Sequence, residues 1–335
     1  MGKEDIQESK LVYSTTKGNS YHGNSIDFLR KCQDNSIDLV MTSPPFALLR
    51  KKEYGNKEQH EYIDWLSEFA EVILQKLKPT GSFVIDLGGA YQKGVPVRSL
   101  YNFRLLIHFC DVIGFHLAEE FYWFNPSKLP SPIEWVNKRK IRVKDSVNTV
   151  WWFSKTEWPK SNVSNVLVPY SERMKKLLQN PSAFYNPAVR PSGHDIGSSF
   201  GTDNGGAIPS NLLQISNSES NSNYQSICKE LGIKTHPARF PSALPEFFIK
   251  MLTNEGDFVV DIFSGSNTTG QACEKLNRRW ASIDLDLGYI SASIFRFLPK
   301  DIQPELALNI YKQVLYNENL VDLKKFQTST ISLFD

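Results

Sequence analysis

The sequence has few cysteines and no long apolar run, and both shortages restrict what the protein can be. The four cysteines are Cys32, Cys110, Cys228 and Cys273. They lack the spacing of disulfide pairs or metal ligands, so we expect free thiols in a reducing cytoplasm and no metal site. No run approaches the roughly 18 apolar residues that cross a membrane, and polar residues 1–10 contain no signal-peptide core. We expect a cytoplasmic protein without a membrane partner.

A strong excess of either charge is also missing. The formal net charge is +2 at pH 7, which alone is weak evidence for a polyanionic partner. A basic face can still exist within a nearly neutral total. The 335 residues are 41% hydrophobic, enough for the core of one large α/β domain or two smaller ones.

A proline-rich loop after a short apolar run is the first informative motif. Residues 37–41 predict a strand, and Thr42-Ser43-Pro44-Pro45-Phe46 follows it. Proline has no N–H and restricts the residue before it, so the loop is stiff and rich in acceptors. The Ser43 hydroxyl, the Pro44 carbonyl and the Phe46 ring suit a flat molecule with an exocyclic amino group. A plain turn at the end of a strand is the alternative.

A second motif lies near the other end of the chain. Residues 258–260 are apolar and lead to Asp261, a turn that contains Gly265, and a helix from about residue 268 to 276. Residues 280–284 predict another strand, which ends at Asp284. This arrangement is typical of nucleoside binding, because glycine admits a close ligand and the acid accepts from ribose hydroxyls. A purely structural β-α-β unit is the alternative.

The remaining chain predicts alternating helices and strands around one irregular region. Helices are expected at 62–77, 100–113 and 243–252, and strands at 82–87 and 147–153. Residues 157–234 are rich in Ser, Asn, Gly and Pro. The prolines and the aromatics Phe184, Tyr185, Phe200 and Tyr224 within this segment favour an ordered loop-rich module over a disordered insertion. Neither α/β half is complete alone. We predict one mostly parallel sheet built from both ends of the chain, with the loops after Met41 and Asp261 side by side.

Together the two motifs resemble those of DNA methyltransferases that methylate exocyclic amino groups with S-adenosylmethionine. In that family a Ser/Asp/Asn-Pro-Pro-aromatic loop holds the target amine, and a strand followed by Phe-x-Gly-x-Gly holds the cofactor. Ser-Pro-Pro-Phe is typical of cytosine-N4 enzymes, and the catalytic loop preceding the cofactor motif is typical of the class called beta. Further blocks that carry the resemblance are residues 50–55, 124–132, 151–155, 190–197 and 236–241.

The resemblance implies a Rossmann-like α/β methyltransferase sheet with a circularly permuted motif order and an inserted, loop-rich target-recognition module. It implies methyl transfer from S-adenosylmethionine to cytosine N4 in a short sequence of double-stranded DNA, with CAGCTG as the expected target. It also implies the modification half of a restriction-modification system, whose cognate restriction endonuclease shares the site. Two alternatives stay open: an adenine-N6 DNA methyltransferase and a catalytically silent DNA-binding relative.

The same resemblance divides the chain into four segments. Residues 1–156 are the N-terminal part of the catalytic domain, and residues 157–235 are the target-recognition region. Residues 236–300 are the part that binds S-adenosylmethionine, and residues 301–335 are a C-terminal tail. Sequence readout is expected from Asn, Gln and Arg side chains between 157 and 234.

Catalysis is expected at the Ser-Pro-Pro-Phe loop and at one further acid. The resemblance assigns it to Ser43, Pro44, Pro45 and Phe46. Cytosine N4 would donate to the Ser43 hydroxyl and the Pro44 carbonyl, while Phe46 stacks on a base turned out of the duplex. Asp86 ends the strand expected beside the catalytic strand, so it is expected to orient Ser43 and help remove the proton. A buried structural aspartate is the alternative for Asp86.

Eight residues are expected around the cofactor. They are Asn24, Phe240, Pro241, Asp261, Phe263, Gly265, Ser266 and Asp284. Two of them depart from the family pattern: Asn24 replaces an aspartate that accepts from the adenine amino group, and Ser266 replaces a second glycine. The Asn24 side-chain oxygen can still accept. Asp261 is expected to anchor the turn or to meet the methionyl ammonium, and His236 is expected to be a structural histidine.

Two basic clusters are expected to contact DNA phosphates. They are Arg50, Lys51 and Lys52 after the catalytic loop, and Lys138, Arg139 and Lys140 further along. Phosphate contacts would make binding strongly dependent on salt. Solvated surface charges are the alternative for both clusters.

Overall fold

The structure is a computed structural model that describes residues 8–46, 61–180, 201–218, 222–316 and 320–327. The chain forms two compact units. The larger consists of Met1–Ser161 and Asn211–Asp335, and the smaller is Asn162–Ser210. The smaller unit therefore covers part of the segment expected to recognise the target, while Asn211 and the residues after it belong to the larger unit.

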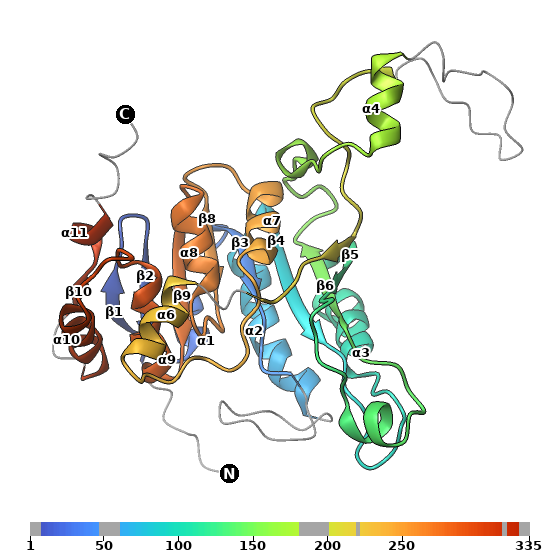
Figure 1. Cartoon of the computed structure of the whole chain (residues 1–335). Coiled ribbons are helices and arrows are strands. Elements are labelled where there is room, and N and C mark those ends of the chain that lie inside the picture. Colours follow the sequence, from blue (N-terminus) through green and yellow to red (C-terminus); the bar gives the residue numbers. More distant parts are fainter. Residues whose placement is uncertain (1–7, 47–60, 181–200, 219–221, 317–319, 328–335) are drawn as a thin grey trace, which may run out of the picture. The chain divides into compact units, whose positions relative to one another are not determined.

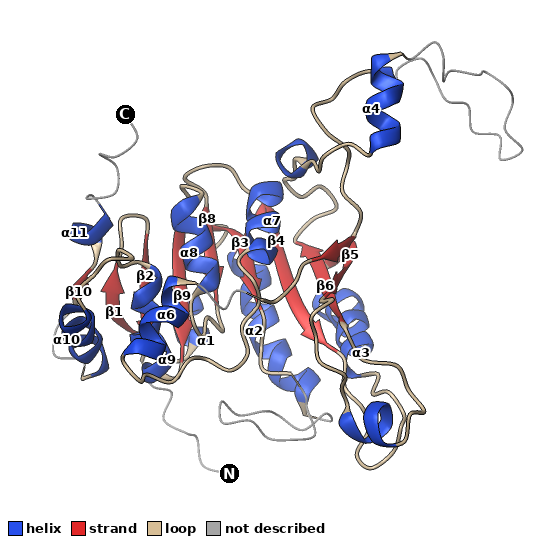
Figure 2. Ribbon diagram, in the orientation of Figure 1, coloured by secondary structure: helices blue, strands red, loops and turns tan. Residues whose placement is uncertain are grey.

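Among the described residues, a ten-stranded sheet runs through the larger unit in the order β10-β1-β2-β9-β8-β3-β4-β6-β5-β7 (Figures 1 and 2). The central strands β2, β9, β8, β3 and β4 are parallel, whereas β6 is antiparallel to both its neighbours. The strands are β1 Lys10–Ser14, β2 Gly18–His22, β3 Ile37–Thr42, β4 Leu77–Gly88, β5 His116–Phe124, β6 Val147–Ser154, β7 Leu212–Gln214, β8 Phe258–Asp261, β9 Arg279–Asp284 and β10 Val321–Asp322. The predicted sheet from both ends of the chain is confirmed, because β8 and β9 lie between β2 and β3.

Helices cover both faces of this sheet (Figure 1). The helices of the larger unit are α1 Ser25–Lys31, α2 Tyr62–Lys76, α3 Tyr101–His108, α6 Asn223–Glu230, α7 Ala243–Leu252, α8 Thr268–Lys275, α9 Leu287–Ser293, α10 Pro304–Leu315 and α11 Lys324–Gln327. Helices α1, α2 and α3 share one apolar cluster with Val40 and Phe83, while α7 packs on β3 and α8. All six residues of β3 are buried, as expected for a strand covered on both faces.

Two sequence-based boundaries differ from the structure by more than one residue. The helix expected at 100–113 is α-helical only over Tyr101–His108 and continues as a π-helical turn, η1, over Phe109–Ile113. The strand expected at 82–87 is longer, because Leu77 already pairs with Ile37 at the start of β4. Both differences concern the ends of elements, where local sequence signals are weakest.

The smaller unit holds short helical segments and turns. These are the 3₁₀ turn η3 Val163–Val166 and helix α4 Glu172–Gln179. Val168 and Ala207 pair as an antiparallel bridge, and the Tyr170 hydroxyl donates to Asp203 Oδ1 at 3.0 Å. The described part of this unit is therefore ordered by local polar contacts.

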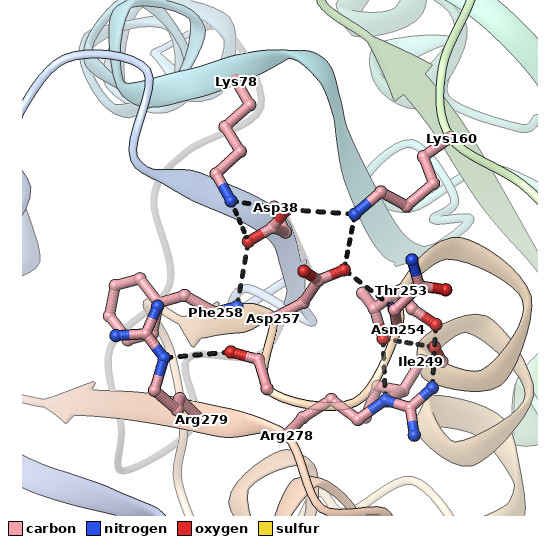
Figure 3. Close-up of polar contacts among 11 residues, drawn as sticks. Asp38, Lys78, Lys160, Ile249, Thr253, Asn254, Asp257, Phe258, Arg278 and Arg279 are labelled. Carbon is pink, nitrogen blue, oxygen red and sulfur yellow. Dashed lines mark hydrogen bonds and ion pairs between the residues drawn. The ribbon is translucent and has the colours of Figure 1, made fainter.

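A network of ion pairs ties the amino-terminal ends of the central strands together (Figure 3). The Asp38 carboxylate on β3 accepts from Lys78 Nζ at 2.7 Å, Lys160 Nζ at 3.4 Å and the Phe258 N–H at 3.0 Å. Lys160 Nζ also donates to Asp257 at 2.6 Å. These contacts join β3, β4, β8 and the segment after β6 at this edge of the sheet.

We expect Asp38→Ala to lower the free energy of unfolding by about 1–3 kcal/mol, measured by urea denaturation. The side chain of Asp38 is 2% exposed, so its removal leaves the partly buried Phe258 N–H without this acceptor. Both lysines are about one third exposed and can turn to water. Glu8→Ala is the control, because the Glu8–Lys31 pair is well exposed and should matter little. Equal effects of the two substitutions would contradict the prediction.

Candidate active site

A cavity of about 870 Å³ opens at the carboxyl-terminal edge of the central strands. The loops after β3 and β8 meet there, because Thr42 Oγ1 donates to Asp261 Oδ1 at 2.7 Å. Of the residues expected to be functional, the cavity is lined by Asn24, Ser43, Pro44, Pro45, Phe46, Asp86, Phe240, Phe263 and Asp284. Residues from both ends of the chain thus surround one space, as expected at this edge of an open α/β sheet.

The Ser-Pro-Pro-Phe loop is held against β4. The Ser43 hydroxyl donates to Asp86 Oδ2 at 3.0 Å. Gly88, two residues after Asp86, leaves room for the Phe46 ring, since a Cβ at this position would lie 2.4 Å from a ring carbon. The loop, the acid and the aromatic ring therefore form one constellation at the ends of two adjacent parallel strands.

Asp86 lies at the centre of this constellation. It is 2% exposed, and Asn148 Nδ2 on β6 donates to its Oδ1 at 3.0 Å. Burial raises the pKa of Asp86 to about 6, against the opposing effects of the Asn148 and Ser43 hydrogen bonds and the positive charge of Lys128. A carboxyl group with this pKa can be ionised at neutral pH and can also take up a proton.

Asp261 anchors the junction of the two loops. Its carboxylate accepts from Thr42 Oγ1 at 2.7 Å, Thr269 Oγ1 at 2.6 Å and the Phe263 N–H at 3.2 Å. Burial raises its pKa to about 6. Asp261 is not among the described residues that line the cavity, so the geometry favours the anchoring role over contact with a methionyl ammonium.

The glycine turn after β8 is shaped by close packing. Gly265 has φ +48°, and a Cβ there would lie 3.1 Å from the His236 ring. Its N–H donates to Asp284 Oδ2 at 2.7 Å. Ser266 is buried and binds Arg296, whose Nη2 donates to Ser266 Oγ at 3.0 Å. Gly265, Ser266 and Pro241 lie outside the described cavity wall, while His236, expected to be structural, lines it.

One half of the cavity has an aromatic wall and polar groups. The Phe263 ring packs against Trp65 and Phe69 of α2, with ring centroids 5.5 and 5.0 Å apart. Asn24 caps α1, because its Oδ1 accepts from the Ile26 N–H at 2.9 Å. Asp284 also lines the cavity; burial raises its pKa, and backbone N–H bonds from Asp286 and Gly265 oppose that rise. This half combines apolar faces with acceptors suited to a nucleoside.

The other half is lined by residues that were not among the expected site residues. They are Trp123, Asn125, Lys128, Ser146, Asn148 and Asn217. In the strand order β6, β5 and β7 lie on one side of β4, and β8 and β9 lie on the other. Residues 124–132 carried the family resemblance, but nothing in their order indicated that they reach the cavity.

The two basic clusters have different outcomes. Arg50, Lys51 and Lys52 lie outside the described residues. Lys138, Arg139 and Lys140 are exposed, and both Lys138 Nζ and Arg139 Nε pair with Glu134, at 3.3 and 2.9 Å. None of these three lines the described cavity wall, so their contact with DNA stays a prediction.

Known proteins are similar to this chain in sequence. The model of a family described as DNA methylase matches residues 37–295. The chain belongs to this family. Type II methyltransferase M.PvuII of Proteus hauseri is 65% identical over 311 residues, which cover 93% of each chain. M.ScaI of Streptomyces caespitosus is 24% identical over 301 residues, which cover 87% of this chain and 86% of its own.

A solved structure extends the similarity to the fold. PvuII DNA methyltransferase (cytosine-N4-specific) has a TM-score of 0.78 and 55% sequence identity, covering 95% of this chain and 99% of its own. In the described part of this DNA methylase, no three His, Cys, Asp or Glu residues are grouped so that they could hold a metal ion. The same part contains no helix with the length and apolar character needed to cross a membrane.

Proposed function

We propose that this DNA methylase is a site-specific enzyme that transfers methyl from S-adenosylmethionine to cytosine N4 in double-stranded DNA. The observation that carries the proposal is the hydrogen bond between Ser43 Oγ and Asp86 inside a cavity whose other half suits a nucleoside. The similarity to M.PvuII and to the cytosine-N4-specific PvuII structure supports N4 as the target atom.

The residues of the aromatic half fit S-adenosylmethionine. Phe263, Trp65 and Phe69 offer apolar surface to its adenosine, and Asp284 offers acceptors to ribose hydroxyls. Asn24 Oδ1 already accepts from Ile26, and an amide oxygen has a second lone pair for the adenine amino group. When bound, the cofactor supplies a methyl group that its sulfonium already makes electrophilic.

The chain's own residues prepare the cytosine amino group. Ser43 Oγ and the Pro44 carbonyl accept hydrogen bonds from N4, which draws its lone pair out of the ring and stabilises developing positive charge. Phe46 stacks on the base, which must leave the duplex to reach the cavity. Asp86 receives the proton through Ser43, because its Oδ2 already accepts from the serine hydroxyl.

Target recognition is proposed for residues 157–235, which include the compact unit Asn162–Ser210. The expected target is CAGCTG with an inner cytosine methylated, supported by the 65% identity to M.PvuII. The basic clusters at 50–52 and 138–140 would contact phosphates. The enzyme would act as the modification half of a restriction-modification system with a cognate endonuclease.

We expect the purified protein to form N4-methylcytosine when unmethylated duplex DNA containing CAGCTG is incubated with labelled S-adenosylmethionine. Nucleoside analysis of the product identifies the methylated atom, and a duplex with a changed hexamer is the control. Formation of N6-methyladenine would show that the target base is adenine and not cytosine. Absence of product together with absence of cofactor binding in calorimetry would favour the silent DNA-binding relative.

A further inference from the structure

The half of the cavity beside β6 and β5 presents a different chemistry from the aromatic half. Near Ser43 and Asp86 the groups that face an amino group are acceptors. Lys128, which follows β5, brings a positively charged donor into the same cavity. A base whose amino group meets the acceptors would therefore present the rest of its hydrogen-bonding edge to a cation.

The Lys128 ammonium has no hydrogen-bond or ion-pair partner within the described residues, whereas the cations around it are engaged. Lys144 Nζ donates to the carbonyls of Pro126 and Lys128, at 3.2 and 3.4 Å. Arg239, which also lines the cavity, donates through Nη1 to the His236 carbonyl. Lys128 is half-buried in the cavity wall, so its charge is available to a ligand there.

The backbone that carries Lys128 is held in place. Its N–H donates to the Asn125 carbonyl at 3.2 Å, closing a turn. Asn125 Oδ1 accepts from the N–H groups of Ser127 and Asn217, at 3.1 and 3.2 Å. This turn joins the ends of β5 and β7 and orients the start of the Lys128 side chain.

The position of Lys128 relative to Asp86 favours contact with a base. Its positive charge acts on the buried Asp86 carboxylate and lowers the pKa of that group. An ammonium that only contacted the DNA backbone would lie outside the cavity, where water screens its charge. Lys128 therefore lies within electrostatic range of the carboxylate that accepts from Ser43, the residue expected to bind the amino end of the base.

We propose that Lys128 is a specificity-determining residue that donates a hydrogen bond to O2 of the cytosine turned into the cavity. The inference rests on the proposed function, because it needs cytosine as the substrate. Along its pairing edge cytosine presents the N4 amino donor, then N3 and O2 as acceptors. Ser43 Oγ and the Pro44 carbonyl supply acceptors for N4, and Lys128 supplies a donor for O2.

Adenine cannot satisfy this arrangement. Its edge presents the N6 amino donor and the N1 acceptor, followed by a carbon-bound hydrogen where cytosine has O2. An adenine in the cavity would leave the Lys128 ammonium desolvated without an acceptor. Sites built to hydrogen-bond one group reject analogues that lack it. Lys128 would thus add cytosine selectivity to a loop whose acceptors fit either amino group.

The test compares Lys128→Met with wild type on duplexes that carry cytosine, adenine or an abasic site at the target position. We expect Lys128→Met to reduce kcat/KM for cytosine by about 10- to 100-fold, mainly through KM. With S-adenosylhomocysteine present, its affinity for the cytosine duplex should fall while its affinity for the abasic duplex stays unchanged. Lys128→Arg should restore part of the selectivity.

Lys138→Met is the matched control, because Lys138 belongs to the exposed cluster proposed to contact phosphates. It should weaken binding to all three duplexes equally and lower the salt dependence. The same uniform loss for Lys128→Met would overturn the proposal in favour of a phosphate contact. If Lys128→Met shifted the pH profile of kcat but left the selectivity between cytosine and adenine unchanged, the proposal would be overturned, because Lys128 would then act only through Asp86. Absence of N4-methylcytosine with wild type would refute the proposed function itself.

Discussion

Ser43→Ala is expected to reduce kcat for methyl transfer by about 100- to 1000-fold, by analogy with the loss of one hydrogen-bonding group that stabilises a transition state. Ser43 Oγ is the side-chain acceptor at the end of β3, and its own hydrogen is directed to Asp86 at 3.0 Å. The oxygen lone pairs therefore remain available to an amino group in the cavity that Ser43 lines. Alanine removes this acceptor and the path of the proton to Asp86.

Measurements of cofactor and DNA affinity distinguish a catalytic role of Ser43 from a structural one. Ser43→Ala should leave both affinities within about threefold of wild type, since only interactions stronger in the transition state change kcat alone. Ser36→Ala is the control, because its hydroxyl donates to the Gln33 carbonyl on the surface. A Ser43→Ala variant with normal kcat would remove the Ser-Pro-Pro-Phe loop from the proposed mechanism.

The elements that carry the two motifs could be predicted because local patterns determine them. Residues 37–41 and 258–261 are short apolar runs that end at turn residues, and they form β3 and β8. Their adjacency follows from the rule for carboxyl ends of parallel strands. The expected pairing of the strand of Asp86 with the catalytic strand places Asp86 within reach of Ser43, and Ser43 Oγ donates to Asp86 at 3.0 Å.

Asn148 and Lys128 could not be predicted as cavity residues, because their positions depend on the register between distant strands. Asn148 lies opposite Gly88 in the antiparallel pair of β4 and β6, and a shift by one residue would turn it to the other face. Lys128 reaches the cavity through the turn that Asn125 closes. Neither the hydrophobic periodicity nor any motif around Asn148 or Lys128 indicates these tertiary contacts.

Asn24 shows a different limit of sequence reasoning. The family pattern drew attention to its lost charge, whereas the structure shows that its side chain caps α1 through Ile26. Asparagine and aspartate are nearly equivalent as N-caps, so the substitution keeps the local fold. The effect of Asn24 on cofactor affinity depends on the direction of the second lone pair of its amide oxygen. The sequence alone does not give that direction.

Asp86→Asn is expected to reduce kcat by about 1000-fold, within the range of lost general-base catalysis, while the fold is retained. The asparagine has nearly the same shape, and its oxygen can still accept from Asn148 Nδ2, which now donates to Asp86 at 3.0 Å. Its amide group cannot take up the proton that leaves N4. Wild-type kcat should therefore rise as pH passes through about 6, the pKa to which burial raises Asp86, and this rise should be absent in the variant.

Stability measurements decide whether the lost activity reflects chemistry or folding. Burial raises the pKa of Asp86 above its unfolded value of 3.8, so its contribution to stability is fully present below that value. The contribution is lost as pH rises through about 6, because the folded protein must then hold a buried charge. At pH 8 Asp86→Asn should consequently be at least as stable as wild type in urea denaturation. If Asp86→Asn had normal turnover while Ser43→Ala were inactive, Asp86 would be a structural residue. If both single variants and the double variant lost kcat equally, Ser43 and Asp86 would act as one unit.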